Sequence, residues 1–218
     1  MISHKALRRF YWLVCALAVV GCFHLETKMV RAANTIETTV QPVKTKEAAA
    51  PATTTKSRHM RTPINWRKSS ETVAYPNLAT AKHFWIKVRL KQNRVYLLDG
   101  RKLLYTMYCT GGTYSRDKQT GKMKSATPTG TFYAQAERGD SFFNQSLNEG
   151  ANYWVSWLNH GEYLFHSVPT VAGGAYNKKE AAKLGKAQGS HGCIRLSVPD
   201  AKWMAANLPV GTKIVIEN

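Results

Sequence analysis

A seven-residue stretch near the C-terminus, Ser190-His191-Gly192-Cys193-Ile194-Arg195-Leu196, brings together a thiol, an imidazole, a glycine and a guanidinium. A cysteine becomes a nucleophile when positive charge or an adjacent base favours its thiolate, and this stretch contains both kinds of neighbour. Gly192 permits a tight backbone, so the main-chain N–H groups of Gly192 and Cys193 are predicted to form an oxyanion hole. The combination indicates acyl transfer with Cys193 as the nucleophile.

This stretch and three other features resemble the L,D-transpeptidase catalytic domain, the YkuD-type family. The other features are Arg195 two residues after the cysteine, Phe165-His166-Ser167 at the end of a strand-like run, and Thr127-Pro128-Thr129-Gly130-Thr131-Phe132. The resemblance covers roughly residues 84–218. It implies a cell-wall transferase that forms 3–3 cross-links between peptidoglycan stem peptides through a thioester on Cys193. It also implies a role in cell-wall biogenesis and cell shape, inhibition by carbapenems, and no need for a metal or other cofactor.

The resemblance assigns roles to the residues around the cysteine. His166 is the expected general base and proton donor, and the backbone carbonyl of Ser167 is the expected third member of the catalytic group. His191 matches a second motif histidine that supports the pocket, although its closeness to Cys193 in the chain also makes it an alternative base.

Two further assignments come from side-chain chemistry. The guanidinium of Arg195 is predicted to bind a substrate carboxylate through two parallel hydrogen bonds, with a structural ion pair as the alternative. Ser190 is predicted to orient the imidazole or polarise the site, with a simple turn serine as the alternative.

The segment between base and nucleophile is longer than in compact family members, with 23 residues between His166 and Ser190. Asn177 as N-cap, Glu180 in the first turn and Gly185 after the last turn predict a short helix within this inserted loop. The insertion is expected to alter the wall of the pocket and not the identity of the base.

Other classes of function fit less well. A metal site built from His160, His166, His191 and Cys193 matches no usual zinc spacing. A papain-like cell-wall hydrolase would place its cysteine before its histidine, the reverse of the order here. A basic wall-binding protein without activity would leave the Ser190–Leu196 stretch without a purpose. An L,D-carboxypeptidase, in which water takes the acyl group, would use the same residues.

The N-terminal part is predicted to direct export. Lys5, Arg8 and Arg9 precede an apolar run over residues 10–23, typical of a signal peptide, so residues 1–32 are interpreted as a signal peptide or a membrane or lipoprotein anchor. Three outcomes stay open: lipid attachment at Cys22, cleavage after Ala32, or an uncleaved anchor. The expected location is the bacterial cell envelope, outside the cytoplasm.

Residues 33–80 are rich in Thr, Ala, Lys and Pro and are predicted to form a flexible linker, which leaves residues 81–218 as the catalytic domain. The chain carries 31 Lys and Arg against 13 Asp and Glu, which favours anionic cell-wall polymers as partners; no nucleic-acid-binding motif accompanies the charge.

The domain is predicted to be mainly β, a sandwich- or barrel-like fold with a few short helices. Residues 84–90 alternate apolar and polar side chains, Asp99-Gly100 and Asn159-His160-Gly161 predict hairpin turns, and residues 213–217 predict a closing strand. Residues 114–125 and the region around Phe142 and Phe143 are predicted to be loops. Ser197 is the predicted N-cap of a helix that ends near Leu208.

Overall fold

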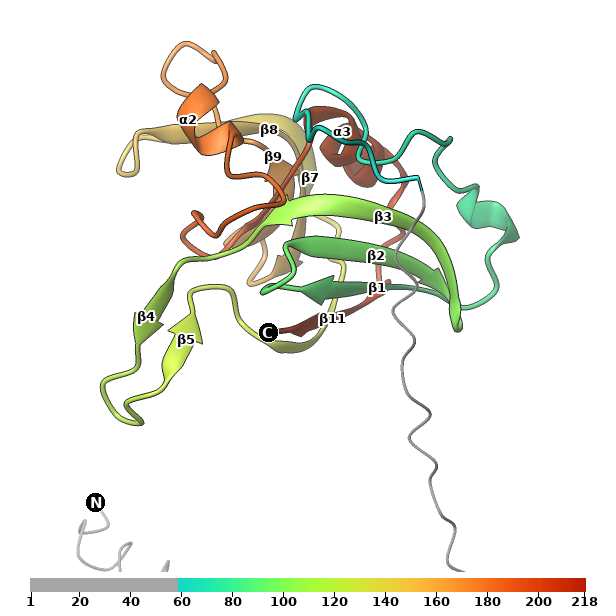
Figure 1. The fold of residues 1–218 in the computed structure, drawn as a ribbon, viewed down its shortest axis with the longest axis horizontal. Helices are drawn as coiled ribbons and strands as arrows, with labels where there is room; N and C mark the ends of the chain where they lie inside the picture. The colour runs from blue at the N-terminus through green and yellow to red at the C-terminus, as the bar shows by residue number, and fades with distance from the viewer. Residues whose placement is uncertain (1–58) are drawn as a thin grey trace, which may run out of the picture. The chain divides into compact units, whose positions relative to one another are not determined.

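The computed structural model describes residues 59–218 (Figure 1). The predicted signal or anchor segment, the predicted lipid attachment at Cys22 and most of the predicted linker lie outside the described residues. None of the helices within residues 59–218 has the length and apolar character needed to cross a bilayer.

This part of the chain is mainly β, as predicted. In chain order the elements are η1 (Leu78–Thr80), β1 (Phe84–Arg89), β2 (Arg94–Asp99), β3 (Lys102–Thr110), β4 (Tyr114–Arg116), β5 (Met123–Ser125), β6 (Gly130–Tyr133), β7 (Arg138–Asn144), β8 (Glu149–Leu158), β9 (Tyr163–Ser167), α2 (Lys178–Ala181), β10 (Ile194–Leu196), α3 (Val198–Asn207) and β11 (Lys213–Glu217).

Nine of these strands form one curled sheet within the described residues, in the order β6-β11-β1-β2-β3-β10-β9-β8-β7. Its two halves approach one another just after β6, where Gln135 N–H donates to Ser156 O on β8. The apolar core lies within this curl and includes Trp157, Phe165 and Met204. The Ser190–Leu196 stretch therefore lies on a curled sheet with an apolar core inside it.

The alternation predicted for the first strand is confirmed, because Ile86, Val88 and Leu90 are fully buried. The Asp99-Gly100 turn joins β2 to β3, and Gly100 has the positive φ (55°) that this turn requires. Asn159-His160-Gly161 joins β8 to β9 in the same way.

Both predicted helices are present. The side chain of Asn177 accepts the N–H of Glu180 at the start of α2, and the side chain of Ser197 accepts the N–H of Asp200 at the start of α3. α2 is only one turn long. The buried face of α3 contains Ala201 and Met204, which pack in the core.

Two predicted loops are strands. Residues 114–125 form the β4–β5 hairpin, which projects from the body of the domain (Figure 1). Most of its side chains are exposed, so no apolar alternation marks the strands. Phe142 and Phe143 lie in β7, where polar neighbours conceal the strand pattern in the same manner.

Residues 59–80, which we call the strap, differ from the predicted flexible linker. Ser70 Oγ donates to the buried carboxylate of Asp200, and Tyr75 OH donates to the same carboxylate at 2.8 Å. The Tyr75 ring stacks on Trp203 with 5.2 Å between ring centroids. The buried carboxylate of Glu71 accepts the N–H of Thr106 at 2.9 Å. The ordered domain therefore begins before residue 81, and its strap is fixed by polar contacts with α3 and β3.

Candidate active site

Two adjacent parallel strands bring the predicted base and nucleophile together. β9 pairs with β10 in parallel, with Arg195 opposite His166 and Ile194 opposite Phe165. Cys193 directly precedes β10, and continuing this register places it opposite Leu164, two residues before His166, on a strand about 4.8 Å away. The backbone hydrogen bonds between β9 and β10 thus bring together two residues that are far apart in the chain.

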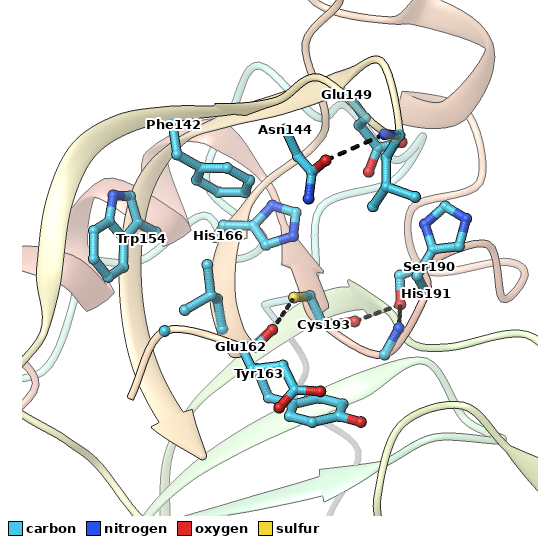
Figure 2. Close-up of a pocket in the computed structure, with 14 residues that line it drawn as sticks. Phe142, Asn144, Glu149, Trp154, Glu162, Tyr163, His166, Ser190, His191 and Cys193 are labelled. Carbon is cyan, nitrogen blue, oxygen red and sulfur yellow. Dashed lines mark hydrogen bonds between the residues drawn. The ribbon is translucent and has the colours of Figure 1, made fainter. Parts of the chain in front are cut away.

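Both residues line one pocket of about 430 Å³ (Figure 2). Its lining residues are Phe142, Asn144, Leu147, Glu149, Trp154, Gly161, Glu162, Tyr163, Leu164, His166, Ser190, His191, Gly192 and Cys193. The β7–β8 hairpin supplies one wall, and the turn into β9 and the catalytic stretch supply the others. The space suits an extended peptide segment near the sulfur atom.

The tautomer of His166 follows from its hydrogen bond. Nδ1 lies 2.7 Å from the backbone oxygen of Ser167, and because a carbonyl oxygen only accepts, Nδ1 carries the proton. Nε2 of the neutral ring is then left with a free lone pair. The main-chain oxygen of Ser167 is thus the partner of His166, while the hydroxyl of Ser167 donates to Val168 O at 2.8 Å.

The ring of His166 is held in a buried site. The side chain is 3% exposed, and the ring of Phe142 packs edge-on against it with 5.6 Å between centroids. Burial, aided by the positive charge of Arg195, lowers the pKa of His166 from 6.5 to about 3, against the opposing effect of the Ser167 hydrogen bond. The imidazole is therefore neutral at neutral pH, the form that a base requires.

The thiol of Cys193 is also neutral at rest. Burial raises the pKa of Cys193 to about 11, with a backbone hydrogen bond and the charge of Arg195 opposing the shift. Sγ lies 3.6 Å from the backbone oxygen of Glu162. A neutral thiol beside a neutral imidazole favours proton transfer during attack over a preformed ion pair.

His191 is placed less favourably for proton transfer. Its side chain is exposed, and Figure 2 shows its ring at the rim of the pocket, across from His166. The supporting position predicted for it fits this placement better than the alternative role of base.

Ser190 is a turn serine, the alternative considered above. It is 2% exposed; Oγ donates to Cys193 O at 2.5 Å and accepts the N–H of Gly192 at 3.1 Å. The second of these bonds corrects the predicted oxyanion hole, because the Gly192 N–H is committed within the loop. The N–H of Cys193 is the remaining candidate donor of the predicted pair.

Arg195 does not face the pocket, which corrects its predicted role as a carboxylate clamp. Its side chain is 1% exposed and forms ion pairs with Glu149 at 2.5 Å and Glu180 at 2.9 Å. It also donates to Gly189 O at 3.0 Å. The structural ion pair considered above is what the structure contains, and it joins β8, α2 and the start of the catalytic stretch.

Replacing Arg195 by methionine should therefore reduce stability. The change leaves Glu149 and Glu180 without their common cation, and we expect the free energy of unfolding to fall by about 3 kcal/mol. Urea denaturation measures this. The matched control is Arg89→Met, which breaks a more exposed pair with Glu217 and should cost about 0.5 kcal/mol. Unchanged stability together with a raised KM in Arg195→Met would instead support the predicted role of Arg195 in binding a substrate carboxylate.

Sequence reasoning missed several residues that shape the pocket. Glu149 lines the wall and neutralises Arg195, and its only sequence signal is a position at the start of a strand. The ring of Phe142 packs against His166, a contact that the prediction of a loop around Phe142 did not include. Among residues 59–218, no group of three His, Cys, Asp or Glu side chains is arranged to hold a metal ion.

Comparison with known proteins gives the family. A model of the L,D-transpeptidase catalytic domain (YkuD) matches residues 83–216. The Bacillus subtilis (strain 168) protein named "Putative L,D-transpeptidase YciB" is 48% identical over 156 residues, which span 72% of this chain and 76% of that protein.

Solved structures match over smaller shares of their length. A fused Zn-dependent amidase/peptidase/peptidoglycan-binding domain-containing protein from Clostridium acetobutylicum is 32% identical with a TM-score of 0.44, over 66% of this chain and 55% of that one. The L,D-transpeptidase LdtMt1, in complex with imipenem, is 22% identical with a TM-score of 0.47, over 62% of this chain and 59% of that one. This chain therefore spans less than two thirds of both structures.

The family match covers more than half of the chain and includes both His166 and Cys193, and the relative from B. subtilis is similar over most of its length. The chain belongs to the L,D-transpeptidase catalytic domain family.

Proposed function

We propose that this protein is a peptidoglycan L,D-transpeptidase that forms 3–3 cross-links through a thioester on Cys193. The observation that carries the proposal is the convergence of Cys193 and His166 in one pocket, with Nδ1 of His166 bonded to Ser167 O so that Nε2 can accept a proton. This is the arrangement that a cysteine acyl transfer requires.

In the first half of the reaction, Nε2 of His166 takes the thiol proton as Sγ attacks the carbonyl carbon of the third residue of a tetrapeptide stem. The N–H of Cys193 binds the oxyanion that develops. The intermediate collapses, His166 returns its proton to the departing amine, and D-alanine leaves. The product is a thioester between the donor stem and Cys193.

In the second half, His166 takes a proton from an amine of a neighbouring stem, which attacks the thioester carbonyl. Cleavage of the C–S bond releases the cross-linked product, and the proton returns to Sγ. The energy of the cleaved donor peptide bond is retained in the thioester, so these steps consume no nucleotide. Attack by water in place of the amine would give L,D-carboxypeptidase activity.

The test is incubation of the full chain with a defined disaccharide tetrapeptide, with products read by mass spectrometry. A dimer formed with loss of one D-alanine supports the proposal, and a monomeric tripeptide as the sole product would make the protein a carboxypeptidase. Lysine-containing and diaminopimelate-containing stems, tested separately, identify the third residue. No product with either stem would contradict the family activity for this chain.

The rate of acylation should depend little on pH between about 4.5 and 8. Because the pKa of His166 is lowered to about 3, the base stays neutral as the pH falls through 6.5, whereas an ordinary histidine would lose about 99% of its neutral form by pH 4.5. The pKa of Cys193, raised to about 11, keeps the thiol protonated at the upper end. Initial rates of acyl-enzyme formation across this range measure the effect; an acid limb centred near pH 6.5 would contradict it.

The proposal includes export to the cell envelope, supported by the basic and apolar pattern of residues 1–32. Stem peptides are the proposed partners of the pocket, and anionic wall polymers are proposed partners of the basic surface. Membrane attachment through the N-terminal segment or through lipid on Cys22 is tested by fractionating cells that produce the full chain and its Cys22→Ala variant.

A further inference from the structure

A buried hydroxyl outside the pocket is bonded directly to the catalytic loop. Thr127 is 1% exposed and does not line the pocket. Its Oγ1 accepts the N–H of Gly112 at 2.8 Å and lies 2.8 Å from the backbone oxygen of Gly192. A hydroxyl has one proton, and the Gly112 N–H only donates, so the hydroxyl proton goes to Gly192 O. The directions of both hydrogen bonds are therefore fixed.

This bond also sets the direction of the N–H of Cys193. The oxygen of Gly192 and the N–H of Cys193 belong to one planar peptide unit, and in a trans peptide these groups point in opposite directions. Since Thr127 holds the oxygen on the buried side of the loop, the N–H of Cys193 is turned to the other side. Cys193 lines the pocket and Thr127 does not, which puts the pocket on the side of the loop away from Thr127.

The loop has little freedom to turn the peptide in another way. Gly192 has a φ of +144°, and a Cβ on it would come within 2.7 Å of Tyr163 Cε1 and 3.1 Å of Ala126 O. Ser190 ties the flanking peptides, because its Oγ accepts the N–H of Gly192 and donates to Cys193 O. Thr127 is the contact that fixes the peptide between them.

We propose that Thr127 is a positioning residue for acyl transfer: its hydroxyl holds the Gly192–Cys193 peptide so that the N–H of Cys193 points at the oxyanion. The inference rests on the acyl-transfer function proposed above and adds a residue that touches neither the substrate nor the reacting atoms. It gives a physical role to the first residue of the Thr127–Phe132 segment.

The test compares two reactions of the same sulfur atom. Acylation by imipenem passes through an oxyanion, whereas alkylation by iodoacetamide is a displacement at a CH₂ carbon and creates no oxyanion at a carbonyl. Thr127→Val keeps the shape of the side chain and removes the hydroxyl. We expect the acylation rate at Cys193 to fall about 10- to 100-fold, with alkylation within about twofold of wild type. Peptide mass mapping reads both adducts at Cys193.

Two further variants complete the design. Thr127→Ser retains the hydroxyl and should restore most of the acylation rate, and Thr129→Val, at an exposed position of the same segment, should have no effect. With the tetrapeptide substrate, Thr127→Val should lower kcat and leave KM nearly unchanged, because the oxyanion exists only during the reaction.

Three outcomes would overturn the inference: normal acylation in Thr127→Val, an equal loss of acylation and alkylation, or a Thr127→Ser variant as slow as Thr127→Val. An equal loss would show that the hydroxyl only maintains the fold of the loop. Failure of the wild-type chain to form any acyl-enzyme would be a different result, which removes the proposed function and this inference with it.

Discussion

Cys193→Ala is expected to abolish both turnover of tetrapeptide stems and formation of a covalent imipenem adduct. Removing the atom that carries the acyl group leaves no route through a thioester, and loss of a covalent nucleophile lowers kcat on the order of 10⁶-fold. Intact-mass spectrometry of the wild type and the variant measures the adduct, and product analysis measures turnover. Imipenem is a carbapenem, the class of inhibitor that the family resemblance implies.

The matched control is Cys109→Ala. Cys109 is fully buried in β3, and burial raises the pKa of its thiol to about 12, so it should not react in the folded protein. This variant should retain its adduct and lose about 1 kcal/mol of stability from the small cavity. An adduct of equal mass on Cys193→Ala would show that the reactive atom lies elsewhere and would end the proposed mechanism.

His166→Ala is expected to lower the rate of acylation by about 10²- to 10⁴-fold while the protein stays folded. The sulfur atom remains, but with a pKa of about 11 it stays protonated at neutral pH and has no base to take its proton. The loss should fall mainly on kcat, since the imidazole acts on the reacting proton. Acylation reactions with imipenem, stopped at set times and analysed by mass spectrometry, give the rate. Thermal unfolding checks that the variant is folded.

His191→Ala separates the two candidate bases. Its side chain is exposed at the rim of the pocket, so its removal should change the acylation rate by no more than about threefold and stability by less than about 0.5 kcal/mol. If this variant loses activity and His166→Ala keeps it, His191 is the base and the buried ring of His166 serves only to pack against Phe142.

Local patterns predicted the elements of this domain well where the signal is local. The alternation in β1, the turn at Asp99-Gly100 and the caps at Asn177 and Ser197 each depend on a few neighbouring residues, and each is present. β4 and β7 were not predicted as strands, because a strand with two largely exposed faces has no apolar alternation to detect.

Long-range polar contacts could not be predicted in this way. The strap has the composition of a linker, yet Ser70 and Tyr75 find a partner in Asp200, more than a hundred residues later. Arg195 is a comparable case. Its neighbours in the chain suggest a guanidinium that is free to bind substrate, but the glutamates that form ion pairs with it come from β8 and from α2. Nothing near either residue in the chain marks such partners.

The pairing of His166 with Cys193 was expected from the family resemblance, and the parallel β9–β10 ladder supplies its physical basis. The predicted oxyanion hole did not anticipate the bond from Gly192 N–H to Ser190 Oγ, because this bond depends on a side-chain rotamer that no sequence pattern reports.

The parallel ladder between β9 and β10 also bears on how this enzyme family can vary. His166 and Cys193 keep their spacing because hydrogen bonds join the neighbouring backbones of β9 and β10, so the length of the crossover between the strands does not set that spacing. Within the crossover, the side chain of Glu180 and the backbone oxygen of Gly189 are both bonded to Arg195 on β10. Residues 168–189 of the crossover do not line the pocket, so this segment can change in length while His166 and Cys193 stay in register.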